Sequence, residues 1–280
     1  MKNQKIWFIT GASRGLGLII TKAVLATGDK VIASVRKNPE ELASQLNNSN
    51  LLTVTLDLTD ELQVKTAVNE GISKFGKIDI LVNNAGFGIL SAVEEATDEQ
   101  VRNNFNTNVF GTLNVIRAIL PFLRKQRSGH IINMSSVGGL TGSPGWGLYN
   151  STKFAIEGLT EALSKELAPL GIFATAVEPG YFRTDFLDGS SLNTIGNIIE
   201  DYADTVGKMR DRAAAVNKKQ PGDPQKLAEA LIEIANCDKP PVHLPLGIDS
   251  LNSYKAKTAA FAADIEAWHD VIIGTDHLDV

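Results

Sequence analysis

The sequence has few of the residues that build disulfides and metal sites. It contains one cysteine, Cys237, in 280 residues, and its four histidines stand far apart at positions 130, 243, 269 and 277. A single thiol excludes an internal disulfide framework and any zinc site made of several cysteines. We therefore expect no metal cofactor, and a lone thiol favours a reducing, cytoplasmic location.

Long hydrophobic runs and an excess of positive charge are also missing. The apolar stretch at 115–123 is broken by Arg117 and Pro121, whereas a membrane-spanning helix needs about 20 consecutive apolar residues. The first apolar run, residues 6–9, is too short for the core of a secretion signal. The net charge of -5 argues against nucleic acid as a partner, because such binding rests on neutralising phosphates. We expect neither a membrane nor a nucleic-acid partner.

Short apolar segments alternate with amphipathic ones up to about residue 185. The predicted strands are residues 6–10, 31–35, 51–56, 78–82, 131–134 and 174–177, with a further candidate at 242–246. Helical patterns occupy residues 15–27, 62–75, 106–126 and 149–170, and a final one lies at 250–268. Near-continuous apolar strands separated by helices predict a parallel sheet covered on both faces. The fold class is therefore α/β, a single Rossmann-like, doubly wound domain with about seven strands.

A glycine-rich turn joins the first strand to the first helix. Residues 10–17 read T-G-A-S-R-G-L-G. Such a turn lets the backbone approach a pyrophosphate and directs the helix N-terminus toward it. The spacing differs from the G-x-G-x-x-G fingerprint, and glycines in a tight turn can also be purely structural. The position between an apolar strand and a helix favours nucleotide binding.

The cofactor preference is predicted from the end of the second strand. An NAD site places a carboxylate about 20 residues after the glycine turn, where it holds the ribose 2′-hydroxyl. Here residues 34–37 read S-V-R-K and contain no acid. Arg36, and Arg14 inside the glycine turn, can bind a 2′-phosphate, although either alone could be a solvated surface charge. Together, on adjacent turns, they favour NADP(H).

Tyr149 and Lys153 open the long helical pattern that follows the fifth strand. A spacing of four residues places both side chains on one face of a helix. A neighbouring ammonium favours the phenolate and lowers the tyrosine pKa from about 10 toward the working range. The Y-x-x-x-K spacing also occurs by chance in ordinary helices, so its meaning depends on the surrounding motifs.

The ordered set of motifs resembles the classical branch of the short-chain dehydrogenase/reductase family. The resemblance covers roughly residues 5–185. It rests on the glycine turn, Asp57, N-N-A-G at 83–86, Asn108, Ser136, Tyr149 with Lys153, and P-G at 179–180 with Thr184. Each motif follows a predicted strand or lies in the next helix, where doubly wound sheets bind ligands. The resemblance implies an NADP(H)-dependent oxidoreductase that transfers hydride between nicotinamide and a ketone or secondary alcohol.

The same resemblance implies a role for each matching residue. Tyr149 would be the general acid or base, Ser136 would polarise the carbonyl oxygen with Ser135 as a rival, and Lys153 would lower the tyrosine pKa and hold the nicotinamide ribose. Asn108 would hold a water that links Lys153 to solvent. The implied cofactor-binding residues are Gly11, Ser13, Arg14, Gly15, Leu16, Gly17, Arg36, Asp57, Leu58, Asn84, Ala85, Gly86, Tyr149, Lys153, Pro179, Gly180 and Thr184.

The substrate wall is expected from residues 87–90, 138–146 and 185–187. Trp146, Phe182 and Phe186 offer apolar area there, which favours an apolar or aromatic ketone, although the same rings could equally be core residues. The long C-terminus and the segment 178–185 look nearest to 17-beta-hydroxysteroid and retinol dehydrogenases. The alternatives are a beta-ketoacyl-carrier-protein reductase and a non-enzymatic NADP-binding regulator; a sugar-nucleotide epimerase or dehydratase would start with a different glycine spacing.

We read residues 1–280 as a single NADP-binding catalytic domain. Residues 185–224 form a substrate-loop region, and residues 247–280 form a C-terminal extension; both are too short and too loosely patterned for a second domain. The expected partners are a small-molecule ketone or alcohol substrate and further copies of the chain. The helices at 106–126 and 149–170 resemble those that build dimer interfaces in the family, so we expect a homodimer or homotetramer.

Overall fold

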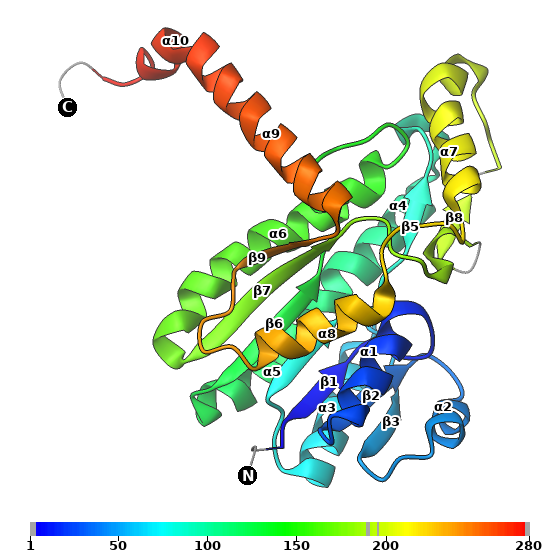
Figure 1. The fold of residues 1–280 in the computed structure, drawn as a ribbon, viewed down its shortest axis with the longest axis vertical. Helices are drawn as coiled ribbons and strands as arrows, with labels where there is room; N and C mark the ends of the chain where they lie inside the picture. The colour runs from blue at the N-terminus through cyan, green and yellow to red at the C-terminus, as the bar shows by residue number, and fades with distance from the viewer. Residues whose placement is uncertain (1–3, 189–190, 195, 278–280) are drawn as a thin grey trace.

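A seven-stranded parallel sheet forms the centre of the protein (Figure 1). The structure is a computed structural model and describes residues 4–188, 191–194 and 196–277. The strands are β1 (Ile6–Ile9), β2 (Lys30–Val35), β3 (Leu51–Thr55), β4 (Ile80–Asn83), β6 (Gly129–Met134), β7 (Ile172–Pro179) and β9 (His243–Leu246). Their order is β3-β2-β1-β4-β6-β7-β9. The chain adds strands outward on one side of β1 and then on the other, which confirms the predicted doubly wound α/β fold.

Helices cover both faces of this sheet. One core cluster joins the sheet to α1 (Gly15–Ala26) and α8 (Pro224–Ala235), and the other joins it to α3 (Glu61–Phe75), α5 (Thr112–Gln126) and α6 (Gly147–Leu167). Side chains of β1 alternate between the two clusters: Trp7 belongs to the first and Phe8 to the second, and both are fully buried. Burial on both faces explains why the strands are continuously apolar.

The predicted helix at 106–126 is divided in the structure. It begins earlier, as α4 (Asp98–Phe105), passes through a π-helical turn at Asn106–Gly111 and continues as α5. The single-helix prediction was therefore wrong, because an inserted π turn leaves the apolar periodicity almost intact. Such turns occur often at functional sites.

Several short elements lie outside the residue ranges predicted above. Helix α2 (Pro39–Leu46) follows β2, and α7 (Lys208–Val216) lies in the substrate-loop region. Strands β5 (Gly88–Leu90) and β8 (Leu192–Thr194) pair in parallel as a second, two-stranded sheet. This pairing ties the segment after β4 to the loop after β7, so the substrate-loop region is joined to the domain by backbone hydrogen bonds. Residues 189, 190 and 195 of that region lie outside the described residues.

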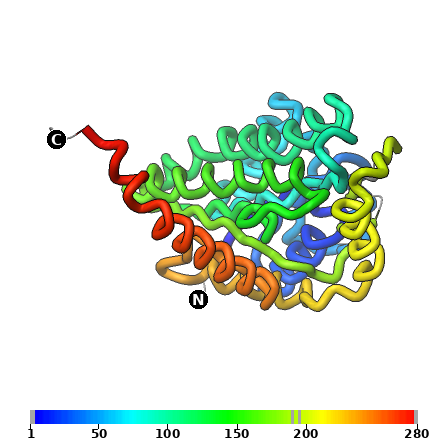
Figure 2. Tube along the Cα trace, turned by 90° about the horizontal axis from the view of Figure 1, so that it is seen from above, coloured from blue at the N-terminus to red at the C-terminus, as the bar shows by residue number. Residues whose placement is uncertain are grey.

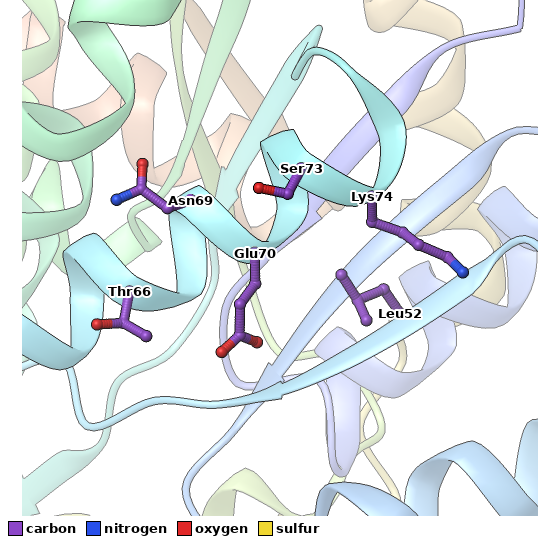
Figure 3. A pocket seen from close by; sticks show the side chains of 6 residues that line it. All are labelled: Leu52, Thr66, Asn69, Glu70, Ser73 and Lys74. Carbon is purple, nitrogen blue, oxygen red and sulfur yellow. The ribbon is translucent and has the colours of Figure 1, made fainter.

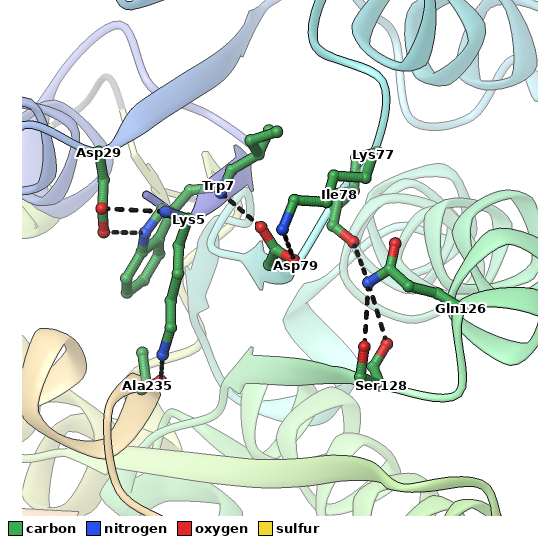
Figure 4. A network of polar contacts seen from close by, with 10 residues as sticks. Lys5, Trp7, Asp29, Lys77, Ile78, Asp79, Gln126, Ser128 and Ala235 are labelled. Atoms are coloured by element: carbon green, nitrogen blue, oxygen red, sulfur yellow. Dashed lines mark hydrogen bonds and ion pairs between the residues drawn. The ribbon is translucent and has the colours of Figure 1, made fainter. Parts of the chain in front are cut away.

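A network of hydrogen bonds and an ion pair lies at the amino end of β1 (Figure 4). Asp29 accepts hydrogen bonds from the indole Nε1 of Trp7 at 3.0 Å and from the backbone N–H of Lys5 at 3.1 Å. Asp79 accepts one from the N–H of Ile6 at 2.9 Å and pairs with Lys77. These acids satisfy backbone donors at the edge opposite the glycine turn, which fixes the entry to β1 and leaves the carboxyl ends for ligands.

The C-terminal residues leave the body of the domain (Figures 1 and 2). We call residues 248–277 the C-terminal arm; it contains α9 (Ile248–Ala267) and α10 (His269–Ile273). Every residue from Tyr254 to His277 is exposed. The last three residues of the predicted extension, 278–280, lie outside the described residues. Within the part of the chain that the structure describes, no helix is both long and apolar enough to cross a membrane.

Candidate active site

The glycine turn has the shape that its three glycines allow. Gly11 and Gly15 have φ of +66° and +54°, in the left-handed region where side chains are strained. A Cβ on Gly17 would collide with the carbonyl oxygen of Gly11 and with the side chain of Asn84. All three positions therefore require glycine for backbone reasons. The close packing also brings the start of α1 against the ends of β1 and β4.

The N-terminus of α1 is suited to bind an anion. Arg14 occupies the N-cap position without a side-chain cap, and the first turn holds no acidic residue. The first N–H groups of a helix lack helical acceptors and favour a negative charge. At Gly15 no atom lies within 4 Å of where a Cβ would stand. This uncapped, open turn fits a dinucleotide diphosphate; Ser13 is exposed beside it, and Leu16 is half-buried against the core.

The two arginines lie on neighbouring turns. Arg14 is exposed at the start of α1, and Arg36 is exposed immediately after β2. The N–H of Ala12 donates a 3.0 Å hydrogen bond to the carbonyl of Ser34, which ties the glycine turn to the end of β2. Asp57 follows β3 and is also exposed, but its carboxylate accepts bonds from the N–H and hydroxyl of Thr59. Leu58 beside it is buried.

Asn84 and Ala85 connect β4 to β1. The amide of Asn84 donates to the carbonyl of Thr10 at 2.9 Å and to that of Gly11 at 3.2 Å. The hydroxyl of Thr10 in turn accepts from the N–H groups of Asn84 and Ala85. Gly86 is exposed, and a Cβ there would stand 3.0 Å from Asn108 Oδ1 and 3.8 Å from Lys153 Nζ. The predicted N-A-G segment therefore joins the glycine turn to the predicted catalytic groups.

Ser136 and Tyr149 meet beside the carboxyl end of β6. Ser136 caps a short helical turn there, and its Oγ accepts a 3.0 Å hydrogen bond from the N–H of Gly138. Tyr149 lies in the first turn of α6 and is 7% exposed. Burial raises the pKa of Tyr149 to about 12, and its hydrogen bond with Ser136 opposes that rise. Ser135, the rival of Ser136, faces Glu157 instead.

Lys153 lies one turn after Tyr149 on the buried face of α6. Its Nζ donates a 2.7 Å hydrogen bond to the carbonyl of Met134 and stands 5.7 Å from the centroid of the Tyr149 ring. Burial lowers the pKa of Lys153 to about 8, while the charge of Glu157 acts in the opposite direction. The expected lowering of the tyrosine pKa by this ammonium is not observed, because loss of solvation of the phenolate dominates.

The π turn places Asn108 against the segment after β4. Its amide donates to the carbonyl of Phe87 at 2.9 Å and to the hydroxyl of Thr152 at 3.1 Å. Its Oδ1 accepts from the N–H of Phe87 at 3.1 Å. The side chain of Asn108 therefore holds the backbone next to Gly86, and the water that it was predicted to hold stays a prediction.

Pro179, Gly180 and Thr184 follow one another from the end of β7. The N–H of Gly180 donates to the carbonyl of Leu246 at 2.9 Å, and a Cβ at Gly180 would collide with the carboxylate of Asp249. Thr184 caps the next helical turn by accepting from the N–H of Phe186. All three lie at the carboxyl edge of the sheet, the edge that also carries Ser136.

Two aromatic rings lie beside the phenol ring of Tyr149. Trp146 lies with its ring centroid 5.8 Å from that of Tyr149, and Phe186 lies at 5.7 Å. These rings share an apolar cluster with Leu90, Leu192, Ala213, Leu187 and Met209. Phe182 does not belong to this wall: it packs with the α1/α8 core cluster, and Gly222 lies against its ring. For Phe182 the structure therefore favours the alternative of a core residue, which the sequence left open.

The short chain dehydrogenase family model matches residues 5–193. The chain belongs to this family. The Oxidoreductase BOA17 of Botryotinia fuckeliana is 39% identical over 97% of this chain and 99% of its own length. A 3-ketodihydrosphingosine reductase of Bacteroides thetaiotaomicron is 38% identical over 87% of this chain and 88% of its own length.

Solved structures with the same fold include another short-chain dehydrogenase. One from Streptomyces avermitilis has a TM-score of 0.90 and 35% identity, covering 98% of this chain and 100% of that one. A 3-ketoacyl-(acyl-carrier-protein) reductase from Brucella melitensis in complex with NADH has a TM-score of 0.72 and 28% identity, covering 86% and 95%. ElxO with NADP bound has a TM-score of 0.71 and 30% identity, covering 86% and 96%. The similar structures therefore include complexes of both cofactors.

One feature of this short-chain dehydrogenase that the sequence does not reveal is a buried clamp made by Glu95. Its carboxylate accepts hydrogen bonds from the N–H of Ala92 at 2.7 Å and the N–H of Ile199 at 3.0 Å, and it pairs with Arg210. Burial opposes the negative charge, but these donors outweigh burial and lower the pKa of Glu95. Glu95 thus fastens the substrate-loop region to the domain, and no local motif marks it.

A second unpredicted group lies behind Lys153. One side-chain oxygen or nitrogen atom of each of Glu157, Glu178 and His243 lies within 4.8 Å of those of the other two. His243 Nδ1 is 3.0 Å from Glu178 and 3.3 Å from Glu157. Burial, together with the neighbouring Glu157, raises the pKa of Glu178 to about 9. Burial raises the pKa of Glu157 as well. The protonated form of these carboxyls is therefore favoured, which explains how the two can be buried together.

A surface hollow far from these groups has no predicted site residue in its lining (Figure 3). It lies between α3 and the edge strand β3, and it is lined by Leu52, Thr66, Asn69, Glu70, Ser73 and Lys74. The charged residues of the hollow, Glu70 and Lys74, lie on the outer surface of α3. We therefore place the candidate active site of this short-chain dehydrogenase beside Tyr149 and not in the hollow.

Proposed function

We propose that this protein is an NADP(H)-dependent reductase of ketones, and of the matching secondary alcohols in reverse. The observation that carries the proposal is the position of Tyr149, which is buried, hydrogen-bonded to Ser136, and enclosed by Trp146 and Phe186. The ring of Tyr149 therefore has apolar surroundings, while its hydroxyl has a polar partner in Ser136. Reduction of a carbonyl needs that combination of an acid and an apolar wall.

The mechanism follows from the protonation states of the two α6 residues. With a pKa of about 12, Tyr149 carries its proton at neutral pH and donates it from Oη to the carbonyl oxygen of the substrate. Ser136 hydrogen-bonds the same oxygen and stabilises the charge that develops there. Lys153, still largely protonated at pH 7, stabilises the phenolate left behind. A bound nicotinamide dinucleotide supplies or accepts the hydride.

The choice of NADP(H) is supported by the positive charge on the turns that follow β1 and β2. Arg14 and Arg36 stand on turns joined by the Ala12–Ser34 hydrogen bond, and residues 34–37 at the end of β2 contain no carboxylate that would repel a 2′-phosphate. The uncapped first turn of α1 would hold the diphosphate. Asn84, Ala85 and Gly86 would line the central part, and Pro179, Gly180 and Thr184 the nicotinamide end.

The substrate that we propose is an apolar or aromatic ketone. Tyr149 shares its cluster with Leu90, Trp146, Phe186 and Leu192, which are apolar throughout. Two of the similar proteins are named as reductases of 3-keto compounds, which supports reduction of a ketone next to a long apolar group. The alternative of a beta-ketoacyl-carrier-protein reductase stays open, and the likeness to steroid and retinol dehydrogenases remains a prediction from the sequence.

An assay with a panel of ketones tests the proposal. We expect NADPH to be consumed with aryl, bicyclic or long-chain aliphatic ketones and slowly with small keto acids. A 3-ketoacyl thioester as the preferred substrate would select the carrier-protein alternative. Tyr149→Phe is expected to lower kcat by about 10²–10⁴-fold while NADPH affinity is kept. NADPH binding without turnover of any ketone or alcohol would favour the regulator.

Two further predictions accompany this proposal. We propose a cytoplasmic location, which fractionation of cells that produce the tagged chain would test. We also propose that the chain is a homodimer or homotetramer, which sedimentation of the purified protein would measure.

A further inference from the structure

The C-terminal arm carries a heptad pattern. Seven residues, all but one of them apolar or aromatic, follow one another at alternating spacings of three and four: Leu251, Tyr254, Thr258, Phe261, Ile265, Trp268 and Ile272. We call this stripe the seam. Helical hydrogen bonds continue past the end of α9, from the N–H of Trp268 to Asp264 and from the N–H of Ile272 to Trp268. Alternating three- and four-residue spacing is the pattern of a coiled-coil seam.

This seam has almost no cover in the described chain. Phe261 and Trp268 are each 62% exposed, and Tyr254, Ile265 and Ile272 are between 42% and 47% exposed. At the base of α9, Ser250 is buried and Lys257 lies over the ring of Phe154. A helix owes most of its stability in a protein to the packing of its apolar face, so a projecting helix with three exposed aromatic residues calls for a partner.

We propose that α9 pairs in antiparallel fashion with α9 of a second copy of this chain. A two-fold axis brings the same surface of both chains together, so the stripe must complement itself. Setting Thr258 opposite Phe261 of the second copy also sets Tyr254 opposite Ile265 and Leu251 opposite Trp268. Each layer of the seam then contains one large ring and one smaller side chain.

The charges along the arm favour this antiparallel arrangement. Lys255 and Lys257 stand in the first half of α9, and Asp264 and Glu266 stand in the second half. In the stated register, Lys257 and Asp264 flank the same edge of the seam, and each faces the opposite charge on the second copy. A parallel pair would instead place lysine beside lysine and acid beside acid.

The composition of the arm argues against a membrane surface as its partner. Residues 248–277 contain two lysines, Lys255 and Lys257, and five acids: Asp249, Asp264, Asp270, Asp276 and Glu266. Helices that lie on membranes are rich in Lys and Arg on their polar face. The Streptomyces avermitilis structure covers 98% of this chain, which leaves fewer unmatched residues than the 20 of α9, so that chain has a counterpart of this helix.

Sedimentation equilibrium of the full chain tests the pairing. Phe261→Asp puts a charge in the seam, whereas Ala263→Asp puts the same charge on the opposite, exposed side of α9 as a matched control. We expect Phe261→Asp to weaken self-association by roughly 100-fold and to halve the assembly mass. Ala263→Asp should leave that mass unchanged. Circular dichroism should be the same for wild type and both variants.

Charge reversal tests the register. Lys257→Glu and Asp264→Lys are each expected to weaken self-association about fivefold, because each turns two symmetric attractions into repulsions, and the double variant should restore it. Four results would overturn the proposal: a wild-type protein that sediments as one chain, an unchanged mass for Phe261→Asp, an equal loss for Ala263→Asp, or a double variant as weak as the single ones. Binding of wild type to phosphatidylcholine vesicles at the expense of self-association would overturn it as well. None of these readouts depends on turnover of a ketone.

Discussion

The ring of Phe186 lies 5.7 Å from the ring of Tyr149, at an interplanar angle of 52°. Phe186 comes from the substrate-loop region, and Tyr149 comes from the rigid helix α6. The proposed acid therefore shares its apolar surroundings with a ring from the substrate-loop region.

Removing this ring should weaken the binding of apolar ketones. We expect Phe186→Ala to raise KM for a bulky ketone roughly tenfold, with a smaller effect for a small ketone, because the lost contact is apolar area. Steady-state kinetics with a size series would measure this. Phe173→Ala, which removes a 40% exposed ring from β7, is the control and should leave KM unchanged. Equal KM changes for large and small ketones would remove Phe186 from the wall.

The rate of ketone reduction should fall as pH rises through about 8. Lys153 has a pKa of about 8, so its ammonium is lost above that pH, while Tyr149 keeps its proton up to about 12. The loss of the ammonium removes the charge that stabilises the developing phenolate. A pH profile of kcat would show the break. In Lys153→Arg, the guanidinium stays charged, so a profile that keeps the break near pH 8 would assign it to another group.

Replacing Arg36 should change the cofactor preference. We expect Arg36→Asp to weaken NADPH binding about 10- to 100-fold, by loss of a charged hydrogen bond and by repulsion, while NADH binding is kept or improved. Titration with both cofactors gives the ratio. Lys37→Asp, with the same charge change at the next exposed residue, is the control. A ratio that changes equally in both variants would mean a general effect of charge.

Loosening the Glu95 clamp should affect the substrate loop before the rest of the domain. Glu95→Gln loses the charged partner of Arg210 and keeps one acceptor oxygen, so it can accept from the N–H of Ala92 or from that of Ile199 but not from both. We expect faster proteolysis within residues 196–216 and a higher KM, with NADPH affinity unchanged. Limited proteolysis with and without NADPH would measure this. Glu99→Gln, at an exposed residue of α4, is the matched control.

The buried pair of Glu157 and Glu178 should make stability depend on pH. The folded state holds a proton on Glu178 up to about pH 9, whereas the unfolded chain releases it near the ordinary value of 4.5. Stability therefore falls as pH rises between these values. The side chain of Glu178→Gln cannot ionise. The urea concentration at which this variant unfolds should therefore rise relative to that of wild type as pH increases. Urea unfolding at pH 6 and pH 8.5, with Glu166→Gln as a surface control, tests this; a constant difference would refute it.

The sequence predicts the sheet and the order of the site motifs because both are local patterns. β1 is a continuous apolar run and β7 a nearly continuous one, and each site motif follows a strand or lies in the next helix. What the sequence does not predict depends on distant partners. Glu95 meets Arg210 across 115 positions, and β5 pairs with β8 through three residues each.

The electrostatics of the site were also beyond local patterns. The spacing of Tyr149 and Lys153 predicts a lowered tyrosine pKa, but the sign depends on how completely the phenol is removed from water. Similarly, the π turn around Asn108 does not alter the apolar periodicity enough to be seen. Both features arise from packing between elements that are far apart in the chain.

The base of the C-terminal arm is joined to the segment that we propose to hold the nicotinamide end of the cofactor. Asp249, in the first turn of α9, accepts a 2.6 Å hydrogen bond from the N–H of Tyr181, and its carboxylate lies against Gly180. A tilt of α9 on pairing would therefore shift the backbone beside Gly180. We expect the specific activity of dilute enzyme to change with protein concentration, so that the amount of enzyme in a cell would influence how well each molecule works.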